Sequence, residues 1–328
     1  MKSGTVGTIA GFLAPDDQSL PEGRMHTLQF EHVTKRYADD LVVEDLSFSV
    51  QPGRVTGFLG PNGAGKSTTM KILLDLASAD QGQATIGGTR YRDLAEPAHT
   101  VGAVLEANAF HPGRSGRNHL RVLADATGVP LARVDEMLRL VGLEQAAGRR
   151  AGAYSLGMRQ RLGLAGALLG DPPVLVLDEP GNGLDPQGVR ELRDLLRARA
   201  AEGNTILVSS HLLAEVEHLA DDVVVINEGR LVATGALSEL QQAGASVRTP
   251  SPDALIPMLE SAGGTVQVRE DKTLMVRGMS LAAIGDRACA AGIPLHELSP
   301  TLGSLEELFL AWTATPGPND SDVEGVSP

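Results

Sequence analysis

The sequence predicts an α/β protein in which a mixed β-sheet carries a glycine-rich loop, followed by a smaller α+β unit. An apolar run at residues 55–59 leads into the loop at 60–67, and helical spacing follows to residue 76. A second apolar run, at 174–177, ends in two carboxylates, as in a strand buried on both faces. Alternating patterns at 26–33, 46–50 and 84–88 add early antiparallel strands. The sheet is therefore predicted to be mixed.

The loop Gly60-Pro-Asn-Gly-Ala-Gly-Lys-Ser67 fits the phosphate-binding pattern G-x-x-x-x-G-K-[ST]. Its glycines let backbone N–H groups approach phosphate oxygens, and the following helix adds its positive N-terminal end. Lys66 is predicted to reach the β- and γ-phosphates, and Ser67 or Thr68 to bind Mg²⁺. A chance glycine-rich turn is the alternative, but the strand and helix lie where the motif requires them. The predicted nucleotide-binding residues here are Gly60, Pro61, Asn62, Gly63, Ala64, Gly65, Lys66, Ser67 and Thr68.

Charge and composition exclude several classes of protein. The 28 basic and 41 acidic residues among 328 give a net charge of −13, which disfavours a nucleic-acid partner. The single cysteine, Cys289, excludes an internal disulfide and is expected to be inert in the core. No apolar run reaches the roughly 18 residues of a membrane span, so we expect any membrane role to come through a partner.

Both ends of the chain are predicted to be disordered tails, at residues 1–24 and 315–328. Residues 6–14 are mildly apolar, so a targeting signal is the alternative for the first tail. Its flanks carry little positive charge and no convincing cleavage site. The folded pattern is expected to begin at residue 25.

The two carboxylates after the second apolar run are candidate catalytic groups. Asp178 is predicted to organise Mg²⁺, and Glu179 to polarise a water molecule for in-line attack on the γ-phosphate. The alternative is an exposed strand end with solvated acids. The same chain also contains a phosphate-binding loop, and the presence of both motifs favours the catalytic interpretation of Asp178 and Glu179.

These motifs, together with Tyr154-Ser-Leu-Gly-Met158, resemble the ATP-binding subunit of an ABC transporter. The resemblance covers about residues 26–240 and implies a P-loop NTPase domain at 25–240 with a helical subdomain at about 113–170. The family signature is usually Leu-Ser-Gly-Gly-Gln. This chain keeps Ser155 and Gly157 and departs at the other three positions. Ser155 precedes a predicted helix at 156–169 and can offer its hydroxyl to an anion.

The resemblance assigns roles to further residues. Ser155 and Gly157 would contact the γ-phosphate of the nucleotide bound by a second subunit, so the resemblance implies a nucleotide-driven dimer. Tyr37, on a short segment between the first two predicted strands, matches the aromatic residue that stacks on adenine. Asp185 belongs to a segment, Gly183-Leu-Asp185, that matches the loop crossing the dimer interface in the family. His211, after a predicted strand at 205–208, matches the histidine that contacts the γ-phosphate.

One family residue is replaced. Glu106 stands where the family has a glutamine that senses Mg²⁺ and the membrane partner. Its carboxylate can still ligate Mg²⁺, directly or through water. The replacement and the Ser-Leu-Gly-Met form of the signature resemble a subgroup of exporters that handle bacitracin and lantibiotic peptides. A groove near Glu106 and the helical subdomain would hold a helix of the membrane partner.

The remaining sequence predicts an accessory domain at residues 245–314. Predicted strands at 247–249, 265–269, 273–277 and 293–298 alternate with helices at 252–262 and 280–291, in the order βαββαβ of a ferredoxin-like domain. A final helix at 305–312 carries Leu305, Leu308, Phe309 and Trp312 on one face. We expect this face to pack against the main domain, with partner or ligand sensing as the alternative.

The sequence thus predicts an ATPase that binds ATP and Mg²⁺, dimerises, and drives export through an integral membrane permease subunit at the cytoplasmic face of the cell membrane. The alternative is a soluble ABC ATPase acting on ribosomes or DNA. One cassette, no heptad run, no cysteine clusters and an acidic balance disfavour it. A catalytically dead module is disfavoured because Lys66, Asp178, Glu179 and His211 are present. The similarity to that exporter subgroup implies an antibiotic, peptide or lipid-like substrate. The identity of the substrate, export as against import, and the choice between homodimer and heterodimer stay open.

Overall fold

The computed structural model describes residues 26–106, 109–241, 244–269, 271–301, 305–306 and 308–309. The predicted tails at 1–24 and 315–328, and Trp312 of the predicted last helix, lie outside the described residues. Within the described part, no helix has both the length and the apolar character of a membrane span.

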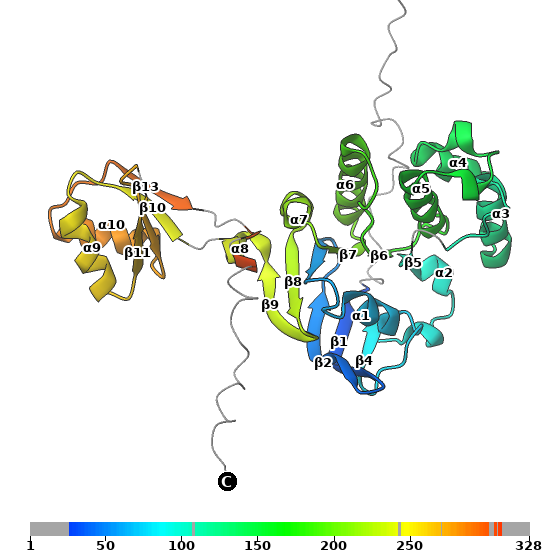
Figure 1. The fold of residues 1–328 in the computed structure, drawn as a ribbon, viewed down its shortest axis with the longest axis horizontal. Helices are drawn as coiled ribbons and strands as arrows, with labels where there is room; N and C mark the ends of the chain where they lie inside the picture. Colours follow the sequence, from blue (N-terminus) through cyan, green and yellow to red (C-terminus); the bar gives the residue numbers. More distant parts are fainter. Residues whose placement is uncertain are drawn as a thin grey trace, which may run out of the picture.

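A six-stranded mixed sheet, in the order β5-β6-β7-β3-β8-β9, forms the centre of the molecule (Figure 1). The first five strands in this order, β5, β6, β7, β3 and β8, are parallel, and β9 pairs antiparallel with β8. The predicted mixed core sheet is therefore confirmed. The strands are β3 (Val55–Leu59), β5 (Val101–Val104), β6 (Val174–Leu177), β7 (Thr205–Ser210), β8 (Asp222–Asn227) and β9 (Arg230–Ala236).

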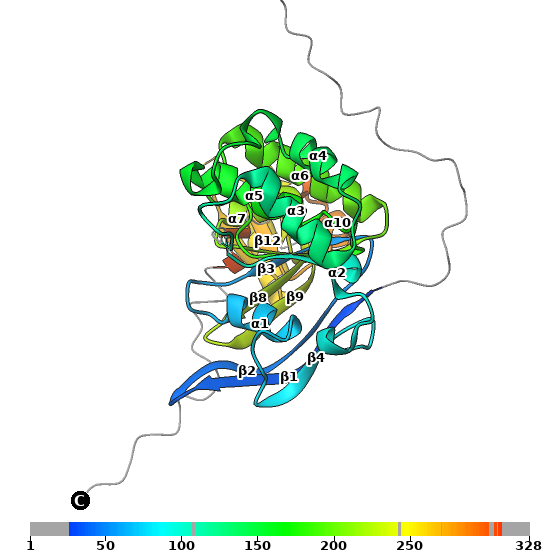
Figure 2. The same cartoon turned by 90° about the vertical axis from the view of Figure 1, so that its right-hand side faces the viewer.

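The early strands form a second, antiparallel sheet in the order β2-β1-β4 instead of joining the central one, as Figure 2 shows. Its strands are β1 (Leu28–Tyr37), β2 (Asp40–Val50) and β4 (Gln81–Ile86). One face packs on the central sheet, because Phe48 lies between Phe30, at 4.2 Å between ring centroids, and Phe58 of β3, at 5.4 Å. Tyr37 is the last residue of β1, so its predicted place on a segment between strands was wrong.

The central sheet is covered on both faces. Val174 and Val176 pack with α1 (Lys66–Leu73) and the antiparallel sheet, whereas Leu175 and Leu177 pack with α6 (Pro186–Ala201). This division explains why β6 is apolar at every position. The segments that follow β3, β6 and β7 lie at one edge of the sheet, because these neighbouring strands are parallel, and the candidate site lies there.

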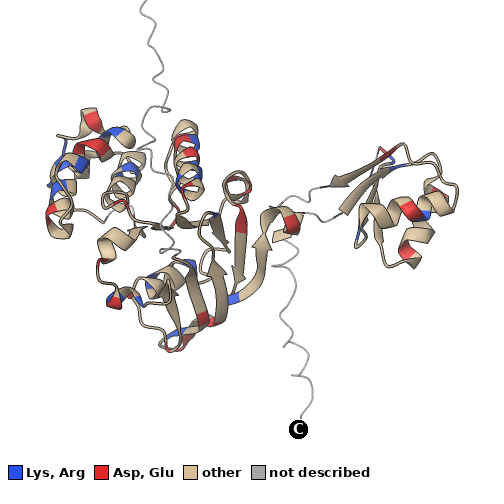
Figure 3. Cartoon of the chain, turned by 180° about the vertical axis from the view of Figure 1, so that it is seen from behind, with Lys and Arg blue, Asp and Glu red and all other residues tan. Residues whose placement is uncertain are grey.

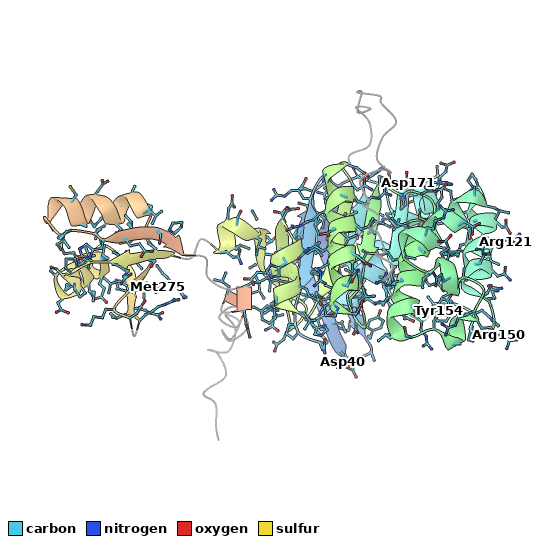
Figure 4. The ribbon with its side chains drawn as sticks, turned by 90° about the horizontal axis from the view of Figure 1, so that it is seen from above. Asp40, Arg121, Arg150, Tyr154, Asp171 and Met275 are labelled. Atoms are coloured by element: carbon cyan, nitrogen blue, oxygen red, sulfur yellow. The ribbon has the colours of Figure 1, made fainter. Side chains whose placement is uncertain are left out.

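A group of helices follows β5 within the region where a helical subdomain is expected. It contains α3 (Gly116–Thr127), α4 (Ala132–Leu140) and α5 (Leu156–Ala167), which lie to one side of the sheet (Figure 1). Tyr154 is buried among them and donates its hydroxyl to the carbonyl of Ala146 at 2.8 Å (Figure 4). Lys and Arg are interspersed with Asp and Glu along α3, α4 and α6 (Figure 3).

The C-terminal elements follow the order βαββαβ. They lie on the far side of β8 and β9 from α3 and α4 (Figure 1). Their antiparallel sheet has the order β11-β12-β10-β13, and Val247, Leu255, Leu274 and Ile284 belong to a hydrophobic cluster of their own. The elements are β10 (Gly244–Arg248), α9 (Pro252–Ser261), β11 (Thr265–Val268), β12 (Leu274–Arg277), α10 (Leu281–Ala290) and β13 (Glu297–Thr301).

Two predictions for this region were wrong. The last strand begins at Glu297, four residues after the predicted start at Ile293, because Ile293 is part of the turn that packs on the cluster. Cys289 is exposed and not in the core. The apolar face of α10 is formed by Ile284 and Ala288, so the next residue points to solvent.

The chain returns to the main sheet at Leu305, which is fully buried beside Val216 and Leu237 as the predicted packing requires. Its N–H donates to Oε1 of Glu217 on α7 (Leu213–Leu219) at 2.8 Å. The same oxygen accepts a second hydrogen bond, at 2.8 Å, from Nε2 of Gln241, the last residue of α8 (Leu237–Gln241).

Candidate active site

The glycine-rich loop joins β3 to α1 and leaves the start of that helix open to an anion. Gly65, which precedes α1, has a left-handed φ of 101°, and no side chain caps the helix. A Cβ atom at Gly65 would lie 2.7 Å from the carbonyl of Val42, so both the conformation and the space require glycine. The N–H groups of the first turn are therefore available for phosphate oxygens.

The amine of Lys66 lies inside the loop. Its Nζ donates to the carbonyl of Gly60 at 2.6 Å and to that of Pro61 at 3.1 Å, and only 6% of the residue is exposed. Burial lowers the pKa of Lys66, while the nearby carboxylates of Glu179 and Asp178 act to raise it. The loop thus holds a cation that faces two acids across the site.

Asp178 accepts hydrogen bonds on both of its carboxylate oxygens. Ser67 Oγ donates to Oδ2 at 2.5 Å, and Ser209 Oγ donates to Oδ1. Hydroxyl and carboxylate oxygens are the ligands that Mg²⁺ prefers, and this cation usually takes only one or two carboxylates beside water and phosphate oxygens. The Ser67–Asp178 pair therefore fits Mg²⁺. Within the described residues, no group of three or more His, Cys, Asp and Glu side chains is arranged to hold a metal ion.

Glu179 has a left-handed φ of 49°, which is uncommon for a residue other than glycine. Its N–H donates to Ser209 Oγ at 2.9 Å. Its Oε2 lies 2.7 Å from Nδ1 of His211, which follows β7. Because an ionised carboxylate only accepts hydrogen bonds, this contact assigns a proton to Nδ1. The structure therefore brings together Lys66, Ser67, Asp178, Glu179 and His211 at the ends of β3, β6 and β7.

Three further residues at the site were missed by the sequence analysis. Ser209 links Asp178 to Glu179, and Gln160 of α5 donates from Nε2 to the carbonyl of Glu179 at 2.9 Å. Glu215 is partly buried, and burial followed by the charge of Glu179 raises the pKa of its carboxyl. Only Ser209 left a signal, a polar residue at the end of an apolar strand just before His211.

The signature residues lie at a different helix end. Ser155 caps α5, with Oγ accepting from the N–H of Met158 at 3.3 Å, and Asp185 caps α6 by accepting from the N–H of Gly188 at 3.0 Å. A Cβ atom at Gly157 would lie 2.7 Å from the carbonyl of Gly183. In the described part of this single chain, no hydrogen bond connects Ser155, Gly157 or Asp185 to the loop at 60–68.

Tyr37 and Glu106 lie at the rim. Tyr37 is 47% exposed, and Lys35 Nζ lies 5.1 Å from its ring centroid. The Glu106 side chain is 70% exposed, with Oε1 3.9 Å from Nζ of Lys71, one turn beyond Ser67 on α1. The structure therefore places Glu106 beside the site without a direct hydrogen bond to Ser67 or Asp178.

Comparison with protein-family models gives two matches. A model described as ABC transporter matches residues 43–182, which contain the loop, the signature segment at 154–158 and Glu179. A model described as a domain of unknown function (DUF8746) matches residues 243–306.

Similar proteins include two curated relatives and a solved structure. The bacitracin transport ATP-binding protein BcrA of Enterococcus faecalis is 40% identical over 220 residues, which cover 66% of this chain and 71% of the relative. The lantibiotic transport ATP-binding protein SrtF of Streptococcus pyogenes is 38% identical over 207 residues, 62% of this chain and 89% of the relative. A structure of the ATP-binding subunit of an ABC transporter is 31% identical, with a TM-score of 0.60 over 66% of this chain and 92% of that one.

Proposed function

Because the chain belongs to the ABC transporter family of ATPases, we propose that it is the ATP-driven motor subunit of an exporter. The observation that carries this proposal is the meeting of the phosphate-binding loop with Asp178, Glu179 and His211 at one edge of the sheet. A relative named as a Nod factor export ATP-binding protein, from Burkholderia orbicola and 44% identical over 214 residues, supports the direction of transport.

ATP binding uses the loop and α1. The phosphates accept hydrogen bonds from the N–H groups of the loop and the first turn of α1, and Nζ of Lys66 turns from the carbonyls of Gly60 and Pro61 to the β- and γ-phosphates. The adenine ring stacks on the half-exposed ring of Tyr37. Ser67 and Asp178 would hold Mg²⁺, and Glu106 would lie nearby. When bound, the cation would neutralise charge on the phosphates.

Hydrolysis uses Glu179 and His211. The Glu179 carboxylate orients and polarises a water molecule for in-line attack on the γ-phosphate. His211 holds that carboxylate through Nδ1, and when the ring also carries a proton on Nε2 it can donate from Nε2 to the γ-phosphate.

The signature residues complete the site of a second subunit. In the proposed dimer, Ser155 and Gly157 of one protomer contact the phosphates held by the loop of its partner, and Asp185 lies at the interface. A separate integral membrane subunit binds near Glu106 and the helical region at 113–170. The chain then works at the cytoplasmic face of the membrane.

The transported substrate is proposed from the relatives. An antibiotic or peptide, such as those in the names of the bacitracin and lantibiotic proteins, fits best. Residues 245–314 are proposed to form an accessory domain, supported by their separate hydrophobic cluster.

The test uses the Glu179→Gln variant, which is expected to bind ATP without turning it over. The full chain is tagged, expressed in its native host and purified with ATP from gently solubilised membranes. One co-purifying multi-span membrane protein supports the proposal. Ribosomes or DNA, with the chain absent from the membrane fraction, would contradict it. Glu260→Gln, which changes an exposed acid of α9, is the matched control and should retain wild-type turnover.

A further inference from the structure

Gln160 is a polar side chain in an apolar part of the structure. Only 6% of the residue is exposed. It lines a small, mostly apolar cavity whose other lining residues are Val104, Arg161, Leu164, Pro180, Leu184 and Leu192. A buried amide costs free energy unless it is hydrogen-bonded, so its partners indicate what it does.

The amide of Gln160 has one assigned partner. Nε2 donates to the carbonyl of Glu179 at 2.9 Å. Because a carbonyl only accepts, the nitrogen and not the oxygen of the amide must face it. Within the described residues, the Oε1 atom is buried with no hydrogen-bond partner. The side chain is therefore oriented by Glu179 alone.

The backbone of Glu179 needs such support, because its φ of 49° costs free energy for a residue with a Cβ atom. Ser209 Oγ accepts from its N–H at 2.9 Å. Gln160 donates to its carbonyl, which also accepts from the N–H of Asn182 at 3.1 Å. Two side chains from other elements thus hold the peptide groups on either side of its Cα atom. This backbone conformation determines where the Glu179 carboxylate points, which is toward His211.

We propose that Gln160 is a positioning residue for Glu179, and that it sets the direction of the carboxylate that activates water. Gln160 lies in the second turn of α5, the helix that begins after Ser155, so the hydrogen bond also ties the signature helix to the end of β6. A change in the position of α5 is therefore transmitted to Glu179 through one contact. This inference rests on the proposed role of Glu179 in hydrolysis.

The test compares the ATPase kinetics of full-length variants. Gln160→Met keeps the length and buried shape of the side chain and removes the donor. It should lower kcat about tenfold to a hundredfold, since a small misplacement of a reacting group has effects of this order. KM for ATP and ATP affinity should stay within about twofold, because the Gln160 side chain donates its hydrogen bond to Glu179 and not to the phosphate-binding loop at 60–67. Gln187→Met, which removes an amide that pairs with Glu191 on α6, is the matched control and should leave kcat unchanged.

A double-mutant cycle separates positioning from general structural support. If Gln160 acts through Glu179, adding Gln160→Met to Glu179→Gln should leave the residual turnover within about twofold. A purely structural role would lower it by the same factor as in the wild-type background, and that result would overturn the inference. Should Gln160→Met not fold, Gln160→Leu replaces it, because its apolar side chain also cannot donate and should give the same loss of kcat.

The two proposals fail in different ways. A wild-type kcat in Gln160→Met beside an inactive Glu179→Gln enzyme overturns only the positioning role. Near-normal turnover by Glu179→Gln overturns the role of Glu179, and with it the inference.

Discussion

Nδ1 of His211 lies 2.7 Å from Oε2 of Glu179, so the two side chains that follow β6 and β7 form one unit. The contact assigns the Nδ1 proton and leaves Nε2 as the second ring nitrogen. It also restricts the carboxylate, whose backbone is held by Ser209. Removal of either side chain should therefore affect turnover more than nucleotide binding.

His211→Ala should lower kcat about a hundredfold, the order of effect expected when a reacting group is misplaced, because the variant loses the contact that holds the Glu179 carboxylate. ATP affinity should change less than about threefold, because in the proposed site the loop and Lys66 would provide most of the contacts with the nucleotide. Steady-state ATPase assays and equilibrium nucleotide binding measure the two quantities. His218→Ala, at an exposed position of α7, is the control. Equal loss of affinity and kcat would assign His211 to binding instead.

Asp178→Asn should raise the Mg²⁺ concentration needed for half-maximal activity about tenfold or more. The amide removes the negative charge, and only one of its two polar atoms can accept, so it cannot reproduce the contacts with both Ser67 and Ser209. A Mg²⁺ titration of ATPase activity measures this shift. Asp253→Asn, an acid in the first turn of α9, should leave the titration unchanged. An unshifted midpoint in Asp178→Asn would remove this carboxylate from the metal site.

Glu215→Gln should stabilise the protein at neutral pH. Burial and the charge of Glu179 raise the pKa of Glu215 above its ordinary value of 4.5, so the native state binds this proton more tightly than the unfolded chain. The free energy of unfolding of the wild type therefore falls as pH rises from about 4.5 to the raised pKa of Glu215. Below pH 4.5 the carboxyl is neutral in both states, and this loss of stability is absent. The group is partly exposed, so the gain in Tm at pH 7.5 should be about one or two degrees.

The Tm difference between Glu215→Gln and the wild type should disappear near pH 4, where both carry a neutral group at this position. Thermal melting across the pH range measures it, and Glu260→Gln should show no such trend. A difference that grows toward acidic pH would have the opposite sign and would contradict the assignment.

Gly157→Ala should destabilise the protein by about 1–3 kcal/mol, the usual cost of overpacking. Its new Cβ atom would lie 2.7 Å from the carbonyl of Gly183, and this contact involves backbone that cannot rotate away. Gly148→Ala is the matched control, because a Cβ atom there meets nothing within 4 Å, and its effect should be within about 0.5 kcal/mol. Denaturant unfolding of both variants measures the difference. Equal stability would mean that residues 181–185 adjust freely.

The sequence predicted where the loop and Asp178 lie in the fold, because motifs and buried strands coincide there. The loop lies between β3 and α1, and Asp178 follows β6, as predicted. An apolar strand followed by a turn and a helix can be arranged in few ways, so these positions could be predicted from the sequence. The sequence could not show which sheet β1 and β2 join. Alternating apolar and polar residues indicate that one face of a strand is buried, but not which strand pairs with it. Gln160 and Glu215 were missed for a related reason. Each is a polar residue on a helix, and only tertiary packing brings it to Glu179.

One oxygen of Glu217 binds the chain on both sides of the C-terminal elements, at Gln241 before them and at Leu305 after them. These elements therefore form a closed loop anchored at its base, in contrast to a module on a single hinge. Closing such a loop costs entropy, and that cost is recovered when the base opens. Release of Leu305 and opening of the base at α7 are thus coupled events. A ligand that pulls on the C-terminal elements would apply tension to α7, the helix that starts two residues after His211.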